Sequence, residues 1–248
     1  MQIGKFLQRM RRYDATYFRH KVYDSVTRKT VEAKIDSRRL HRFHPDFVEM
    51  HIRRKGEFRN RIFPHYDEYI HRVSNEIMTA SLELCLFLLS LCEFHRPKRI
   101  LDLGSGFSSF LFRSYAAGAD PEPEVWSVDD SAEWLEKTRS YLAAHDLPVA
   151  NLLTWDALVA RDAGRFDLVL YDLGGFDFRK DSFPRVLEFS GENAFLVVDD
   201  MHAAEFGRSV IRHLRKAGLP YFSAWTYTND KYGRYSLLAQ CGAREGRR

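Results

Sequence analysis

The chain has 248 residues, of which 45 % are hydrophobic and 29 % are charged. This composition is typical of a globular protein and excludes a mainly disordered chain, while 14 glycines and eight prolines exclude a collagen-like one. Three cysteines are too few to hold a chain of this length together by disulfides, and Cys85, Cys92 and Cys241 match no metal-binding spacing. We therefore expect free thiols and a cytoplasmic location.

Basic residues are concentrated near the N-terminus. Up to Arg61 the chain has 17 Lys and Arg against seven Asp and Glu, whereas the remainder has 21 against 27. This asymmetry indicates an anionic partner, namely a phosphate-bearing substrate, a nucleic acid or a membrane surface, although a solvated helical face accounts for it equally well. The longest apolar run, residues 80–92, is shorter than the roughly 20 residues that a spanning helix needs, so we expect no membrane span.

The first part of the chain has a helical pattern. Apolar residues such as Phe6 and Met10 recur there at loose helical spacing. Ser74 is the predicted N-cap of the next helix, in which Ile77 begins an apolar stripe that continues until shortly before Pro97. We therefore divide the chain into a basic helical N-terminal extension, residues 1–73, and a second domain, residues 74–248.

After Pro97 the pattern changes to strands that alternate with helices. Strands are predicted at residues 99–103, 124–129, 151–154, 166–172 and 194–199, and helices at residues 107–117, 130–145 and 203–217. Two further strands, residues 221–227 and 235–241, are joined by a polar turn and predict an antiparallel hairpin at the end. The fold class is therefore α/β, with a doubly wound, mostly parallel sheet of seven strands.

An acidic residue follows or ends each of four predicted strands. These residues are Asp102, Asp129, Asp172 and Asp199. Ligands of doubly wound sheets bind beyond the carboxyl ends of the strands, so the four carboxylates are candidates for one shared site.

The loop after the first of these strands, Asp102-Leu-Gly-Ser-Gly106, resembles a nucleotide-binding loop, and Asp129 is placed to accept hydrogen bonds from both ribose hydroxyls. A dinucleotide site would need a third glycine, but position 109 is serine. An acid at position 102 instead suits a ligand that places a cationic amino group next to this loop. S-adenosylmethionine is such a ligand.

Residues 97–241 resemble the class I S-adenosylmethionine-dependent methyltransferases, which have a Rossmann-like fold. The matching stretches are ILDLGSGFSS, VWSVDDSAEWLEKTRSYL, FDLVLYDLGG and AFLVVDDMH. The cofactor-binding residues that this resemblance implies are Asp102, Gly104 and Gly106 at the methionine part, with Ser108 in the same loop, Asp129 at the ribose and Asp156 at the adenine. Ser108 and Ser109 stand where many members have a third glycine.

Three carboxylates, Asp172, Asp199 and Asp200, lie at the ends of neighbouring predicted strands and suit Mg²⁺ or a similar divalent ion. The pattern is similar to metal-dependent O-methyltransferases of the catechol and natural-product sugar types. Leu173 departs from the acid-His pair of the catechol type, which puts a catechol substrate in doubt. Asp172 and His202 are the predicted catalytic residues, because a neutral imidazole near an ion-bound hydroxyl can take its proton.

The sequence thus predicts metal-assisted O-methylation of a small hydroxylated acceptor, a saccharide or a glycosylated metabolite. A nucleic-acid methyltransferase that uses the basic segment is the main alternative, although the Asn/Asp-Pro-Pro-Tyr pattern of many base methylases is missing after residue 171. A non-catalytic binding protein on the same fold and a nicotinamide oxidoreductase are further alternatives. The N-terminal extension would cover the cofactor cleft, shape the acceptor pocket or form the contact of a homo-oligomer.

Overall fold

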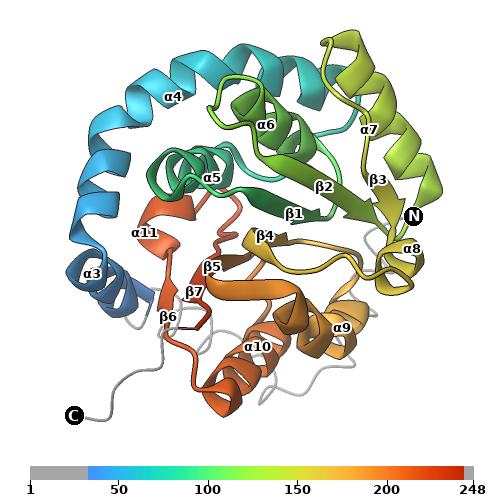
Figure 1. Cartoon of the computed structure of the whole chain (residues 1–248). Helices are drawn as coiled ribbons and strands as arrows, with labels where there is room; N and C mark the ends of the chain where they lie inside the picture. Colours follow the sequence, from blue (N-terminus) through green and yellow to red (C-terminus); the bar gives the residue numbers. More distant parts are fainter. Residues whose placement is uncertain (1–32, 243–248) are drawn as a thin grey trace, which may run out of the picture.

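The computed structural model describes residues 33–242 (Figure 1). Its strands are β1 (Arg99–Leu103), β2 (Glu124–Asp129), β3 (Leu152–Thr154), β4 (Phe166–Tyr171), β5 (Ser190–Val198), β6 (Tyr221–Ser223) and β7 (Leu237–Gln240). They form one sheet in the order β3-β2-β1-β4-β5-β7-β6. The pairs among β1 to β5 are parallel, and β7 runs antiparallel to both β5 and β6. The predicted doubly wound, mostly parallel sheet with an antiparallel end is confirmed.

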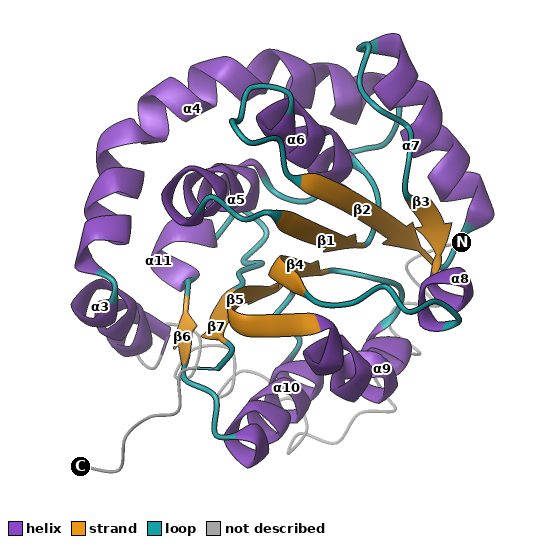
Figure 2. Ribbon diagram, in the orientation of Figure 1, coloured by secondary structure: helices purple, strands orange, loops and turns teal. Residues whose placement is uncertain are grey.

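Helices cover both faces of the sheet (Figure 2). They are α3 (Ala33–Phe43), α4 (Pro45–Arg72), α5 (Leu82–His95), α6 (Phe107–Ala116), α7 (Ala132–Ala144), α8 (Trp155–Val159), α9 (Phe176–Phe189), α10 (Ala204–Ala217) and α11 (Trp225–Thr228). Helices α4 to α7 lie on one side, and α9 and α10 on the other (Figure 1). Within residues 33–242, no helix combines the length and apolarity needed to cross a membrane.

Strand β4 shows why the sheet is buried on both faces. Its side chains alternate between two apolar cores: Leu168 and Leu170 pack with the residues of α5 and α6, whereas Val169 and Tyr171 pack with those of α9 and α10. A continuous apolar run suits this position because neither face of the strand meets water. The chain becomes polar where β4 ends, which places the acids at the carboxyl edge of the sheet.

Helix α4 shares its core with the rest of the fold. Its buried residues Phe58, Ile62 and Tyr66 belong to the same apolar cluster as the leucines of α5. The helical prediction for the N-terminal region is therefore confirmed for residues 33–72, while Phe6 and Met10 lie outside the described residues. The separation at residue 73 stays a prediction, but the structure does not give α4 a core of its own.

The helix predicted to be capped by Ser74 begins seven residues later. Residues 74–81 form a turn in which the Asn75 side chain accepts hydrogen bonds from the backbone N–H groups of Ile77 and Met78, both at 3.0 Å. Ser81 caps α5 instead, because its hydroxyl accepts from the Leu84 N–H at 3.1 Å. Ile77 is consequently exposed beside the sheet edge rather than buried in a helical stripe.

The C-terminal part differs in two details. The predicted strand 221–227 is interrupted after residue 223, where α11 begins, although β6 and β7 still pair as an antiparallel hairpin. Helix α9 has no counterpart among the predicted elements. Pro184 lies inside it, and a proline argues against a helix interior when only the sequence is read.

Candidate functional site

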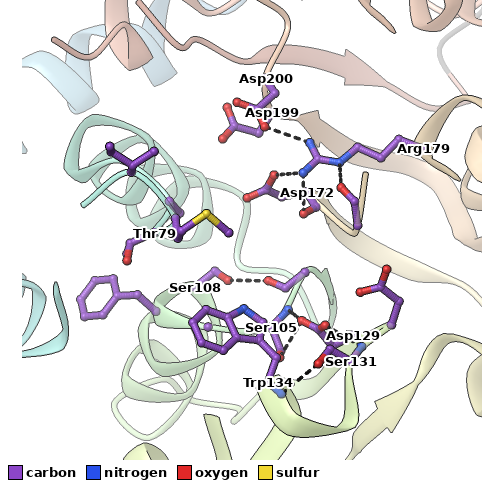
Figure 3. A pocket seen from close by; sticks show the side chains of 18 of the residues that line it. Thr79, Ser105, Ser108, Asp129, Ser131, Trp134, Asp172, Arg179, Asp199 and Asp200 are labelled. Atoms are coloured by element: carbon purple, nitrogen blue, oxygen red, sulfur yellow. Dashed lines mark hydrogen bonds and ion pairs between the residues drawn. The ribbon is translucent and has the colours of Figure 1, made fainter. Parts of the chain in front are cut away.

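A cavity of about 410 Å³ opens at the carboxyl edge of the parallel strands. Its walls come from the loop after β1, the turn after β2, the ends of β4 and β5, and the segment 77–80 (Figure 3). This volume is within the usual range of about 300–1,000 Å³ for small-molecule sites. The sheet topology and the cavity therefore agree on the place of the ligand.

The glycine loop forms one wall of the cavity. Gly104 has a φ of 109°, and a Cβ atom there would lie 2.5 Å from the backbone oxygen of Asp172. Only glycine allows the loop to approach the end of β4 so closely. Gly106 and Ser108 also line the cavity, as predicted, and the Ser108 hydroxyl donates to the Gly104 carbonyl at 3.3 Å.

Asp102 is not among the residues that line the cavity, so its assignment to the cofactor stays a prediction. The side chain is fully buried, and its Oδ2 accepts a hydrogen bond of 2.5 Å from the Ser109 hydroxyl in the first turn of α6. Burial raises the pKa of Asp102 to about 6. The sheet register explains the difference, because Asp102 pairs with Ser127 and Leu170 and so lies two residues before the level of Asp129 and Asp172. Its function is to hold the loop against α6.

Asp129 lies on the cavity and organises both loops beside it (Figure 3). Its Oδ2 accepts from the Ser105 N–H at 2.9 Å and the Ser105 hydroxyl at 3.0 Å, and its Oδ1 accepts from the Ser131 N–H at 3.0 Å. A carboxylate has about four acceptor positions, so one remains on Oδ1. Asp129 can thus accept one ligand hydroxyl rather than two, and Asp130 also lines the cavity.

Asp156 is exposed in the first turn of α8 and is not among the cavity residues, so the structure does not support its assignment to the adenine. Two aromatic residues that the sequence reading assigned to no site line the cavity instead. Trp134 follows the Ser131 cap of α7, and Tyr69 comes from α4. They provide flat apolar surfaces of the kind that a purine or sulfonium ligand can contact.

The predicted acidic group converges. Asp172, Asp199 and Asp200 each present a carboxylate oxygen, and these oxygens lie within 4.8 Å of one another. Burial raises the pKa of Asp172 to about 8 and that of Asp199 to about 6, and the Asp199 Oδ1 also accepts from the Ser236 hydroxyl at 2.6 Å. Such a group needs a nearby positive charge.

Arg179 from α9 supplies that charge. Its guanidinium lies 2.7 Å from Asp172 Oδ1 and 3.2 Å from Asp200 Oδ2, and its side chain is only 8 % exposed (Figure 3). The same group donates to the backbone oxygens of Asp172 and Gly174, both at 2.9 Å. Each of its three nitrogens is thus engaged, and Arg179 opposes the rise in the pKa of Asp172.

This arrangement does not fit a divalent ion with Arg179 in place. An ion coordinated by the three carboxylates would lie next to a buried guanidinium that already holds two of them. The two positive charges would repel strongly in this poorly solvated position. The oxygen donors expected for a metal are therefore present and close together, but the positive charge that balances them is the guanidinium of Arg179.

His202 stands beside this group rather than in the cavity. Its Nδ1 lies 3.4 Å from Asp200 Oδ1, and the residue is absent from the cavity lining. The predicted role of His202 as proton acceptor therefore has no direct geometric support. Asp172, the other predicted catalytic residue, does line the cavity.

Arg234 and the segment 76–79 form the remaining wall. Arg234 is paired with Asp230, Nε to Oδ2 at 2.6 Å, and donates to the backbone oxygens of Ile77 at 2.6 Å and Thr79 at 3.2 Å. It thus anchors the turn that carries the exposed side chains of Ile77 and Met78 at the cavity. Nothing local in the sequence signals this contact between residues more than 150 positions apart.

Solved methyltransferase structures share this architecture, and the chain has the fold of class I S-adenosylmethionine-dependent methyltransferases. The methyltransferase PaMTH1 of Podospora anserina, bound to S-adenosylhomocysteine, matches with a TM-score of 0.57 and 14 % identity over 71 % of this chain and 86 % of its own. The Streptomyces achromogenes O-methyltransferase TomG, which is involved in tomaymycin synthesis and was solved with S-adenosylmethionine, matches with a TM-score of 0.51 and 19 % identity over 66 % and 81 %.

An O-methyltransferase from Bacillus cereus in complex with S-adenosylhomocysteine gives a TM-score of 0.52 at 14 % identity, over 66 % of this chain and 82 % of that one. No protein-family model and no curated protein sequence matches the chain. At these identities the comparisons establish the fold, and the chemistry has to be argued from the site.

Proposed function

We propose that this protein is an S-adenosylmethionine-dependent methyltransferase that methylates a hydroxyl group of a small acceptor. The proposal rests on one observation. The glycine loop, Asp129 and the acidic group around Asp172 line the same cavity at the carboxyl edge of the sheet. The glycine loop and Asp129 suit the donor, and the acidic group suits an acceptor hydroxyl. The nucleic-acid alternative stays a prediction, because about half of the basic segment precedes residue 33.

When bound, S-adenosylmethionine supplies a methyl group on a positively charged sulfur. The residues of this chain have to orient an acceptor oxygen and remove its proton. Asp172 is the proton acceptor in this proposal, since it lines the cavity and its raised pKa of about 8 suits proton transfer near neutral pH. Arg179 holds the Asp172 carboxylate in position by its 2.7 Å contact.

The acceptor would enter beside Ile77 and Met78. These side chains are 63 % and 67 % exposed although both line the cavity, so they offer apolar surface to an incoming molecule. Asp199 and Asp200 lie opposite the glycine loop and can accept hydrogen bonds from further hydroxyl groups (Figure 3). An acceptor with several hydroxyls and one apolar face, as in a saccharide or a glycosylated metabolite, matches both features.

The metal-assisted form of this reaction, which the sequence predicts, is not part of the proposed mechanism. One carboxylate oxygen of Asp172 and one of Asp200 are paired with Arg179, whose positive charge lies where an ion would bind. No step therefore depends on a bound ion.

The cofactor assignment predicts a difference between two aspartates. Changing Asp129 to alanine should weaken binding of S-adenosylhomocysteine by at least about tenfold, since it removes a ligand hydrogen bond and the groups that order both loops. Asp156→Ala is the matched control, because Asp156 is exposed and lies outside the cavity lining. Calorimetric titration of the two variants measures both affinities. Equal affinities, or a loss only in Asp156→Ala, would overturn the ribose assignment.

The role of Asp172 predicts a pH dependence. Its pKa is raised to about 8 by burial, so the carboxyl is protonated at lower pH and cannot accept the proton of the acceptor. Turnover should therefore rise with pH through about 8, while Asp172→Asn should lose turnover by about 100-fold or more and keep its cofactor affinity. A flat pH–rate profile from about pH 6 to about pH 9, or an active Asp172→Asn variant, would refute this role.

A further inference from the structure

A second group of metal-ligating side chains lies on α4 and at the end of α7. His65 and Glu68 stand one turn apart on α4, and His145 is the residue that follows α7. One donor atom from each of the three residues lies within 4.8 Å of the other two. We propose that His65, Glu68 and His145 form a binding site for a zinc ion that links α4 to the methyltransferase fold.

The donor set distinguishes this group from the acidic one. Two imidazoles and one carboxylate are ligands that zinc prefers, and three protein ligands leave a fourth position for water. The acidic group offers only carboxylates, two of which Arg179 holds. At the α4 group, Glu68 pairs through its Oε1 with the exposed Arg72 at 2.9 Å and through its Oε2 with His145 Nε2 at 3.3 Å.

One separation between donor atoms matches a tetrahedral site. Ligand atoms about 2.1 Å from a zinc ion lie about 3.4 Å from one another, close to the 3.3 Å between Glu68 Oε2 and His145 Nε2. The His65 ring centre lies 5.1 Å from that of His145, and a donor nitrogen of His65 lies within 4.8 Å of the donor atoms of the other two residues. All three residues are partly accessible, which leaves a path for the ion.

A zinc ion at this site would lie between α4 and α7, close to the wall that α4 contributes to the cavity. The Tyr141 hydroxyl donates to the His65 carbonyl at 3.0 Å, so α4 and α7 already meet at this residue. Tyr69, one turn farther along α4, lines the cofactor cavity. A zinc ion here would fix the wall that α4 contributes to the cavity. The competing explanation is that the imidazoles only pack on aromatic rings, as His65 does on Phe110 with ring centres 4.9 Å apart.

Zinc titration of the untagged full chain, without cofactor, separates the two explanations. We expect one zinc ion per chain and a rise in melting temperature at micromolar ZnCl₂, with no change at the same concentration of MgCl₂. His145→Ala and the milder Glu68→Gln should each weaken zinc binding by at least about tenfold. His213→Ala is the control, since His213 lies on α10 and bonds to the Ser209 carbonyl; it should bind zinc as the original chain does.

Absence of one-to-one zinc binding, or binding that survives both His145→Ala and Glu68→Gln, would overturn the proposal. Titration of the same samples with S-adenosylhomocysteine reports the cofactor site separately. A failed zinc site therefore leaves the proposed methyltransferase function intact, and a failed cofactor site leaves the zinc proposal intact.

Discussion

Replacing Arg179 by methionine should be among the most damaging single changes in this protein. The variant keeps an unbranched side chain of similar length but leaves the partly buried carboxylates of Asp172 and Asp200 without their partner. Removing one member of a buried ion pair typically costs about 3–5 kcal/mol of unfolding free energy. For a domain of this size we expect the melting temperature to fall by about 10 °C.

The same variant tests whether Arg179 takes the place of a metal. With the guanidinium removed, millimolar Mg²⁺ or Mn²⁺ should raise the melting temperature of Arg179→Met, whereas the original chain should not respond. Arg185→Met is a suitable control, because Arg185 is on the same helix and pairs with Glu188 at the surface; this change should have little effect. A stable Arg179→Met variant, or an original chain stabilised by Mg²⁺, would contradict the assigned role.

Substituting Gly104 by alanine should disrupt the loop on which the cofactor assignment rests. The added Cβ would lie 2.5 Å from the Asp172 carbonyl oxygen, so the end of β4 or the loop has to move. Overpacking of this kind costs about 1–3 kcal/mol, and the positive φ of 109° adds about 1–2 kcal/mol. Affinity for S-adenosylhomocysteine should fall by at least about tenfold, as calorimetry would show.

Gly233 provides the matched comparison for Gly104. It also has a positive φ, 77°, but an added Cβ there would meet no atom within 4 Å. Gly233→Ala should therefore show only the small backbone cost and keep its affinity for S-adenosylhomocysteine. If both variants behaved alike, close approach of the loop to β4 would not be the reason for glycine at position 104.

Strands β1, β2, β4 and β5 were predictable as short apolar runs with an acid at or beside their end, and a helix signal follows β1, β2 and β5. Burial on both faces imposes this pattern, as in β4. The residues after these strands could thus be placed on one edge of the sheet, and Gly104, Asp129 and Asp172 do meet there. Asp102 differs from Asp129 and Asp172 in depth, because in the sheet register it lies two residues before them and therefore inside the fold.

The rest of the site depends on contacts that no local pattern encodes. Arg179 reaches the acidic group from a helix that contains Pro184, and no sequence pattern indicates that helix. Tyr69 comes from α4, which was predicted to be part of an extension. The metal prediction followed from counting acids at the strand ends, and only the folded chain shows that a buried arginine neutralises two of them.

Calorimetric titration of the full chain with S-adenosylhomocysteine in excess EDTA tests whether the cavity binds this cofactor without a metal. We expect saturable binding at one site per chain, with the same affinity when EDTA is replaced by Mg²⁺. No binding in either buffer would contradict the assignment of the cavity to this cofactor, and binding that requires Mg²⁺ would contradict the role of Arg179 as the positive charge of the site.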